Sequence, residues 1–180
     1  MGLYKTGYLA SNPIDNVPAP RLQKKILSSI TREQLDTIFN YCKFDRDKAL
    51  VTFLFYSGIR LSEAVNVRAK NFDFEQGTVG ILGKGNRYRK ALSGNGIVKA
   101  WFSEHDSFEL GRTGIKTMIQ RLSNDSSISF NCHSLRRSFA CHCIKSGLSS
   151  RVTQLLGGWA SLKLVEHLTP KYGYNKQVTC

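Results

Sequence analysis

The sequence predicts an α+β fold that is mainly α-helical and carries a small antiparallel β-sheet near residues 71–91. Two observations support this prediction. Apolar residues recur at helical spacing on both sides of that segment, whereas within it they alternate with polar residues, as in half-buried strands. The chain therefore runs as helices, then a small sheet, then helices again, and we find no internal repeat.

The first part of the chain, residues 1–26, is expected to be a linker or leader. It has no sustained apolar period, and its prolines favour an extended path that ends in basic residues. We expect the folded domain to span residues 27–168 and a short C-terminal tail to span residues 169–180.

Two helices are predicted at the start of the folded domain. Thr31 can act as the N-cap of the first and form a capping box with Gln34. The second is predicted from Asp45 to Ser57, and apolar residues occupy almost all of its faces. We therefore expect this helix to be buried nearly all round and to end at Gly58.

Arg60 follows Gly58 at a junction between two helices. Ser62 is expected to cap the second of these helices, beside Glu63. An arginine on such a turn is expected to have a fixed direction. Without a functional role, it would be a surface residue paired with Glu63.

The sheet is predicted because the apolar period changes to two at Asn71. Two strands are expected, joined by a turn at residues 76–77, and a second turn at residues 83–86 carries Lys84 between two glycines. Residues 87–90 then form a basic strand, so Lys84 lies at the tip of a hairpin. The alternating apolar residues are Phe72, Phe74, Val79 and Ile81.

Helical patterns resume after the sheet. We predict helices at residues 97–102 and 114–122, a loop at residues 123–127, and a further helix that begins near His133 and is closed by Gly147.

The next helix is predicted to have Ser149 or Ser150 as its N-cap. The glycines of Gly157-Gly158-Trp159 should break it, and a last helix should start at Ser161.

The stretch from Asn131 to Ala140, NCHSLRRSFA, contains residue types that suit phosphate chemistry. His133 and Arg136 lie three residues apart and share one helix face, whereas Leu135 and Phe139 share another that can be buried. Arginine can donate two parallel hydrogen bonds to a phosphate, and histidine titrates near neutrality. Taken alone, the stretch is equally well explained as a helix start with solvated polar residues.

The composition indicates a polyanionic partner. Lysine and arginine total 26 against 13 acidic residues, a formal net charge of +13, which favours nucleic acid or anionic lipid. The longest apolar segment, residues 49–56, is too short to cross a membrane, and no signal core follows the N-terminus. We therefore expect a cytoplasmic protein without a membrane partner.

The five cysteines do not indicate a metal site. Their number is odd and they form no C-x-x-C pair, so we expect reduced thiols. Cys141, His142 and Cys143 are adjacent and point in different directions on a helix, and no second ligand cluster is present.

Four motifs occur in order along the chain: SGIRLSE with Arg60, GKGNRYR with Lys84, HSLRRSFA with His133 and Arg136, and LLGGWASL with Trp159. Together they resemble the catalytic domain of the tyrosine recombinase (phage integrase) family, and the resemblance covers roughly residues 27–168. The preceding NPIDNVPAPR resembles the linker that joins a DNA-clamping domain to the catalytic domain in this family. We expect the clamping domain itself to be missing.

The resemblance implies a site-specific recombinase or integrase that cleaves and rejoins double-stranded DNA. A tyrosine hydroxyl attacks a phosphodiester and leaves a 3′-phosphotyrosine and a free 5′-hydroxyl, and a second strand's hydroxyl reverses the step. No metal, other cofactor or small-molecule substrate is implied. The expected partners are duplex DNA and further copies of the chain, as a tetramer on DNA.

The resemblance also implies roles for the motif residues. Arg60 and Arg136 would neutralise charge on the phosphoryl oxygens, and Lys84 would protonate the leaving 5′-oxygen. His133 would accept a proton or donate a hydrogen bond to the phosphate.

Further positions have supporting roles. Trp159 matches the position where the family has histidine or tryptophan, whose ring N–H bonds the phosphate, and Glu63 matches an acidic position that orients its neighbours. The residues expected to follow the DNA backbone, unless they are merely solvated, are Arg68, Lys70, Arg87, Arg89, Lys90 and Arg137.

The chain departs from the family pattern at the nucleophile. In the family the tyrosine lies nine residues beyond the histidine or tryptophan position, which is Leu168 here. Three explanations stay open: the chain lacks a nucleophile, Tyr172 acts from a shifted C-terminal segment, or Tyr174 or another residue acts. Pro170 is expected to end the preceding helix, which carries Tyr172 away from the family's geometry.

These alternatives lead to two functions. Tyr172 would make the protein an active strand-exchange enzyme. Without a nucleophile, it would be a DNA-binding relative with an architectural or regulatory role. A type IB topoisomerase has a similar pocket, but the compact size and the linker favour a recombinase.

Overall fold

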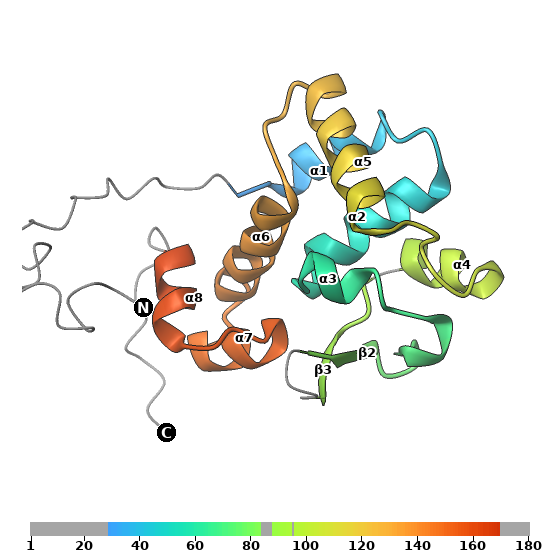
Figure 1. Ribbon diagram of the computed structural model, residues 1–180. Helices are drawn as coiled ribbons and strands as arrows, with labels where there is room; N and C mark the ends of the chain where they lie inside the picture. Colours follow the sequence, from blue (N-terminus) through green and yellow to red (C-terminus); the bar gives the residue numbers. More distant parts are fainter. Residues whose placement is uncertain (1–28, 84–87, 95, 170–180) are drawn as a thin grey trace, which may run out of the picture.

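The computed structural model describes residues 29–83, 88–94 and 96–169, which form the mainly helical α+β fold that the sequence predicts (Figure 1). Three of the predicted site residues, Lys84, Arg87 and Tyr172, lie outside the described residues, as does Tyr174. The helices are α1 (Arg32–Phe39), α2 (Asp45–Ser57), α3 (Leu61–Ala64), the 3-10 helix η1 (Ala69–Asn71), α4 (Gly96–Glu104), α5 (Arg112–Asp125), α6 (Cys132–Lys145), α7 (Ser150–Gly157) and α8 (Leu162–Leu168). The strands are β1 (Phe72–Asp73), β2 (Thr78–Leu82) and β3 (Tyr88–Leu92).

Helix α2 is the centre of the domain. It packs against α6 on one side and α4 on the other, and both lie beside it in Figure 1. Leu50, Val51 and Phe53 on successive faces are fully buried, so the predicted all-round burial is confirmed. Burial of each such side chain stabilises the fold by about 1.5–3 kcal/mol.

The predicted helix ends around α2 are also confirmed. Thr31 caps α1 and forms the capping box with Gln34. Gly58 ends α2 in the left-handed conformation, with φ of 59°, and its N–H donates to the carbonyl of Leu54. The ring of Phe139 on α6 occupies the space that a side chain at Gly58 would need. This glycine therefore lets α6 approach the end of α2 closely.

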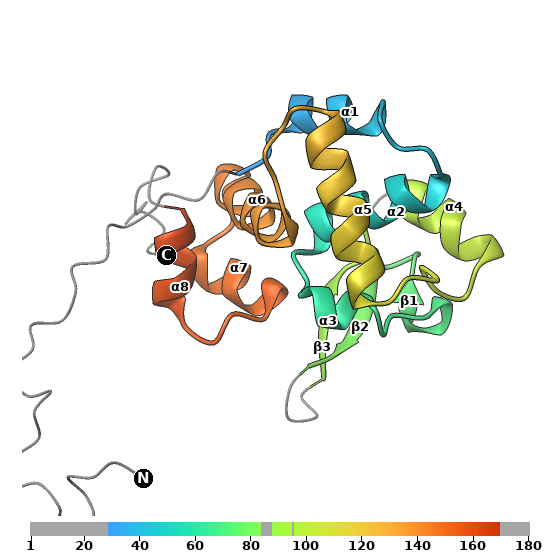
Figure 2. The ribbon, with the colours of Figure 1, turned by 45° about the horizontal axis from the view of Figure 1, so that its top comes forward.

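The sheet has the order β1-β2-β3, and both pairs of strands are antiparallel. Val79 and Ile81 on β2 are buried in the core, as their alternation predicts. Figure 2 shows the sheet on the same edge of the domain as α3. Phe74 was predicted to lie in the first strand, but β1 already ends at Asp73, whose carboxylate accepts the N–H of Gln76 and starts the turn.

Two predicted boundaries are wrong. Ser62 does not cap α3, because the helix begins at Leu61 and the Glu63 carboxylate accepts the backbone N–H of Arg60 instead. The segment 123–127 is not all loop, because α5 continues to Asp125. An ion pair between Arg121 and Asp125, four residues apart, supports this added turn.

The last three helices form a compact unit in which α7 and α8 pack against α6 (Figure 1). The predicted signals hold here: Ser149 caps α7, Gly158 ends it in the left-handed conformation, and α8 follows Ser161. Leu135 and Phe139 are buried as predicted. No helix within residues 29–83, 88–94 and 96–169 is long and apolar enough to cross a membrane.

The contact between α2 and α6 generates a stability prediction. Gly58→Ala and Gly77→Ala both place a side chain at positive φ, which costs about 1–2 kcal/mol. Only at Gly58 does the new methyl group also meet the Phe139 ring, since nothing lies within contact distance at Gly77. Displacing a packed ring adds about 1–3 kcal/mol. We expect urea denaturation to give the larger loss of unfolding free energy for Gly58→Ala, and equal losses would contradict this packing.

Candidate active site

The described residues enclose one prominent cavity of about 670 Å³ between α3, α5 and α6. Four of its lining residues are cationic at neutral pH, and none of the lining residues is an aspartate or glutamate. The cavity is therefore suited to an anion. Its lining residues are Ile59, Arg60, Leu61, Ser62, Arg112, Lys116, Ile119, Gln120, Phe130, Asn131, Cys132, His133 and Arg136.

Arg60 lines the cavity because of the chain path after Gly58. Ile59 is buried and anchors the turn, and Arg60 takes the extended conformation immediately before α3. Its guanidinium donates to the Glu63 carboxylate at 3.0 Å and to the Gly158 carbonyl at 2.7 Å. The side chain remains 45% exposed. Both terminal nitrogens of the Arg60 guanidinium are thus hydrogen-bonded, while part of the side chain remains exposed at the cavity.

Arg136 extends from α6 into the same cavity and is 9% exposed. Its Nη1 donates to the Gly58 carbonyl, and its guanidinium carbon lies 4.4 Å from the centre of the Trp159 ring. Burial, followed by the positive charge of Arg60, lowers the pKa of Arg136 to about 9. An anion between the two arginines would relieve both the lost hydration and the repulsion.

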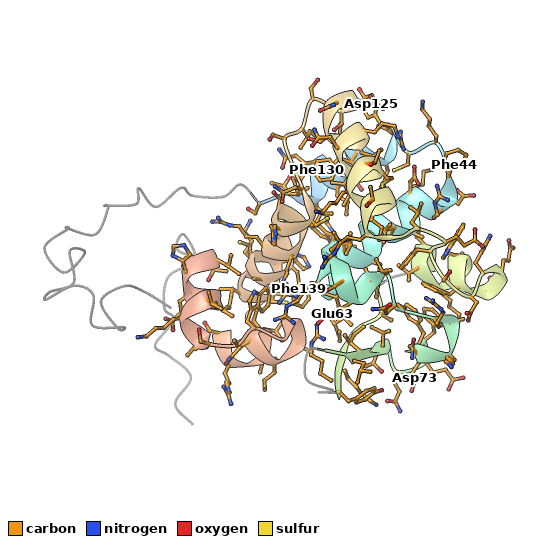
Figure 3. The ribbon with its side chains drawn as sticks, in the orientation of Figure 1. Phe44, Glu63, Asp73, Asp125, Phe130 and Phe139 are labelled. Atoms are coloured by element: carbon orange, nitrogen blue, oxygen red, sulfur yellow. The ribbon has the colours of Figure 1, made fainter. Side chains whose placement is uncertain are left out.

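Glu63 is buried on α3 and forms ion pairs with Arg60 and Arg89, each at 3.0 Å; Figure 3 labels it together with Phe139 of α6. Burial alone would raise the pKa of the Glu63 carboxyl. The backbone N–H of Arg60 and the guanidinium of Arg89 outweigh this and hold the pKa below its ordinary value. Glu63 is therefore an ionised structural partner, and it is not among the residues that line the cavity.

His133 lies on the exposed first turn of α6 and also lines the cavity. The Asn131 side chain accepts the backbone N–H groups of His133 at 2.8 Å and of Ser134 at 3.0 Å, and so fixes the start of the helix. The positive end of the α6 dipole thus points at the cavity. The predicted shared face of His133 and Arg136 is confirmed, because both border the same space.

Trp159 follows the glycine turn at the end of α7. Its backbone N–H donates to the Gln154 carbonyl at 3.1 Å, and its ring stacks on Phe139 with centroids 6.2 Å apart. A side chain at Gly157 would collide with the Trp159 ring. The glycine pair therefore lets the indole lie flat, where it supports the Arg136 guanidinium.

Leu168 is the last residue of α8 and does not line the cavity. Its backbone carbonyl lies 3.7 Å from the Cys141 thiol. The cysteines within the described residues are all free thiols, as expected. In that same part of the chain, no group of three histidine, cysteine or acidic side chains is arranged to hold a metal ion.

The residues predicted to follow the DNA backbone fall into two groups. Lys70 and Lys90 are exposed, and Arg68 is partly exposed and paired with Asp106 at 3.7 Å. The surface position predicted for Arg137 is wrong, because this side chain is only 6% exposed. Arg89 is also withdrawn from the surface, since it is 17% exposed and paired with Glu63.

Three residues of the cavity wall, Arg112, Lys116 and Gln120, were not predicted from the sequence. They are spaced four residues apart along α5, whose buried residues include Ile115 and Leu122. The i, i+4, i+8 spacing of polar residues was the available signal. It is typical of any solvated helix face, and only the fold turns this face towards Arg60.

Comparisons with known proteins identify the family. The sequence model of the phage integrase family matches residues 28–172. Tyrosine recombinase XerC of Oceanobacillus iheyensis is 27% identical over 196 residues, covering 93% of this chain and 64% of the relative. Tyrosine recombinase XerD of Neisseria meningitidis serogroup B is 29% identical over 191 residues, covering 92% of this chain and 66% of the relative.

The fold is also similar to that of solved structures. A crystal structure of a lambda integrase dimer bound to a COC′ core site superposes with a TM-score of 0.75 at 14% identity, covering 99% of this chain and 57% of that one. The chain covers 64% and 66% of the lengths of the two Xer recombinases, just under two thirds in each case. From its motifs, its cavity and the match over residues 28–172, the chain belongs to the phage integrase family.

Proposed function

We propose that this chain is the catalytic domain of a site-specific DNA recombinase, which binds the phosphodiester to be cleaved in the cavity between α3, α5 and α6. One observation carries the proposal: Arg60, Arg136 and His133 come from two separate segments and converge on one cavity without a carboxylate in its lining. The net charge of +13 supports a polyanionic substrate. The likeness to an integrase bound to a core site supports duplex DNA as the partner.

The residues have the following proposed roles. The Arg60 and Arg136 guanidiniums stabilise the negative charge that develops on the non-bridging phosphoryl oxygens. A tyrosine hydroxyl forms the bond to phosphorus and gives up its proton, for which His133 is the acceptor. The bond from phosphorus to the 5′-oxygen breaks, and Lys84 supplies the proton that completes the 5′-hydroxyl.

Trp159 assists by supporting Arg136. The face of an indole ring attracts a cation, and this attraction keeps the guanidinium in place before the phosphate arrives. Lys70 and Lys90 are proposed to contact the DNA backbone. Assembly as a tetramer on DNA and residence in the cytoplasm follow from the same proposal.

The second candidate function rests on Leu168. Because this position carries no hydroxyl, the chain can retain the phosphate cavity and still lack the covalent step, unless Tyr172 or Tyr174 supplies it. It would then be a DNA-binding relative with an architectural or regulatory role. The covalent adduct distinguishes the two functions.

DNA affinity is the first test of the cavity. Arg60→Gln removes a guanidinium from the cavity, whereas Arg32→Gln removes one from α1, where Arg32 contacts Tyr56 instead. Because one charged hydrogen bond contributes about 1.5–3 kcal/mol, we expect Arg60→Gln to weaken duplex binding by about 10- to 100-fold. The slope of log affinity against log salt should fall by about 0.9 per lost phosphate contact.

The measurement is fluorescence anisotropy of a labelled duplex titrated at several salt concentrations. Arg32→Gln should change the affinity by less than twofold. Equal losses of duplex affinity in both variants would indicate that the DNA does not bind at the cavity, which would contradict the proposal.

Covalent capture is the second test. The starting chain, Tyr172→Phe and Leu168→Tyr are incubated with duplexes nicked beside candidate cleavage sites and resolved on a denaturing gel. A protein–DNA band from the starting chain that Tyr172→Phe abolishes identifies a shifted nucleophile. A band that appears only with Leu168→Tyr identifies an intact phosphate cavity that lacks its nucleophile.

Arg136→Gln is then introduced into the protein that forms the adduct, either the starting chain or Leu168→Tyr. We expect it to slow adduct formation by about 10²–10³-fold, because it removes a hydrogen-bond donor to the developing negative charge on the phosphoryl oxygens. Lys163→Gln, which changes an exposed residue of α8, is the control and should leave the rate unchanged. An adduct that forms at the full rate without Arg136 would rule out the proposed site.

A further inference from the structure

Arg89 has surroundings that do not suit a DNA ligand. It is on β3, between the exposed residues Tyr88 and Lys90, and its side chain turns inward and is 17% exposed. One nitrogen, Nη2, donates to Glu63 Oε2 at 3.0 Å and to the Gly157 carbonyl at 3.3 Å. Both acceptors belong to other elements, so this nitrogen joins the hairpin to α3 and to the end of α7.

The Glu63 carboxylate is the centre of this connection. Its Oε1 accepts from the Arg60 guanidinium at 3.0 Å, and its Oε2 accepts from the Arg60 backbone N–H at 2.8 Å as well as from Arg89. The two arginines then reach the glycine turn, Arg89 at the Gly157 carbonyl and Arg60 at the Gly158 carbonyl. Three segments distant in sequence are thus joined through one carboxylate and two carbonyls.

The packing of the glycine turn depends on Arg89. Gly158 has φ of 67°, and a side chain there would collide with the Arg89 Nε. That Nε is buried and has no hydrogen-bond partner among the described residues, so the guanidinium is held by Nη2 and by contact with the turn. The next residue after the turn is Trp159, whose ring lies 4.4 Å from the Arg136 guanidinium.

We propose that Arg89 is a positioning residue of the phosphate cavity, which ties the hairpin and Glu63 to the Gly157–Gly158 turn and thereby sets Trp159 against Arg136. It acts through its neighbours and does not touch the DNA backbone. The inference rests on the proposed function only in taking the cavity to be a phosphate site. The linkage itself is a property of the protein without DNA.

The test follows Trp159 directly. The protein has two tryptophans, so labelling with 5-fluorotryptophan gives two ¹⁹F resonances, and Trp159→Phe identifies the one to follow. Arg89→Ala should shift the Trp159 resonance by more than its line width and leave that of Trp101 on α4 in place. Lys90→Ala, the matched control on the same strand, should leave both resonances unchanged.

A conservative variant separates positioning from simple packing. Because a single nitrogen makes both contacts, the lysine ammonium of Arg89→Lys can donate to Glu63 and to Gly157 from the same point. We therefore expect Arg89→Lys to restore the native Trp159 resonance and Arg89→Gln not to restore it. If Arg89→Ala fails to fold, the comparison of lysine with glutamine decides the question alone.

The pH profile gives an independent readout. Glu63 is faced by Arg60, Arg89 and Arg136, and by the carbonyls of the glycine turn. Its pKa is lowered in the folded protein, so its ion pairs are present above its ordinary pKa and are lost as the pH falls through the folded value. Removing Arg89 takes away one of the groups that lower this pKa, so the acid transition of the Trp159 resonance should move to higher pH in Arg89→Gln.

Two results would overturn the inference. One is a native Trp159 resonance and acid transition in Arg89→Gln. The other is a loss of DNA affinity and salt slope that is the same for Arg89→Gln and Lys90→Ala, which would make Arg89 a backbone ligand. If Arg60→Gln leaves DNA binding intact while the Trp159 resonance responds as stated, the proposed function fails and the positioning role stands.

Discussion

Two guanidinium groups, those of Arg60 and Arg136, face one cavity, and the surrounding structure holds them there against their mutual repulsion. Burial and the charge of Arg60 together lower the pKa of Arg136, because both disfavour its charged form. The partners that stabilise it are a carboxylate, two backbone carbonyls and the face of an indole ring. Only one of these, Glu63, carries a full negative charge, so the cavity keeps a positive field that suits an anion.

The scaffold achieves this with backbone features more than with side chains. Gly58 ends α2 in a conformation that exposes its carbonyl to Arg136 and leaves room for Phe139. The glycine pair at the end of α7, Gly157 and Gly158, offers its carbonyls to Arg89 and Arg60. Carbonyl dipoles can satisfy the donors of a guanidinium without neutralising it. Both turns therefore fix the direction of a cation and preserve its charge.

Local patterns predicted most of the fold, whereas the network behind the cavity could not be predicted from them. Helix α2, the Thr31 capping box and the antiparallel hairpin follow from periodicity and capping, which act over a few residues. Arg60, His133 and Arg136 were found because their motifs occur together in a known order. The pairing of Arg89 with Glu63 could not be predicted, because nothing in its neighbourhood on β3 indicates a carboxylate 26 residues away in the chain. Arg137 on α6 is likewise only 6% exposed, and its burial depends on packing between elements that no local pattern specifies.

Residue 168 and the cavity are held in place by different contacts. The contact between α6 and the end of α8 is made by the Cys141 thiol with the backbone carbonyl of residue 168, and Val165 and Thr169 are the buried residues of that segment. The side chain at position 168 is not among the residues that line the cavity. A change at this position therefore removes or restores a hydroxyl without disturbing the groups that hold Arg60 and Arg136. Under the proposed function, the fold can keep the cavity intact whether or not residue 168 carries a hydroxyl, because the two depend on different contacts.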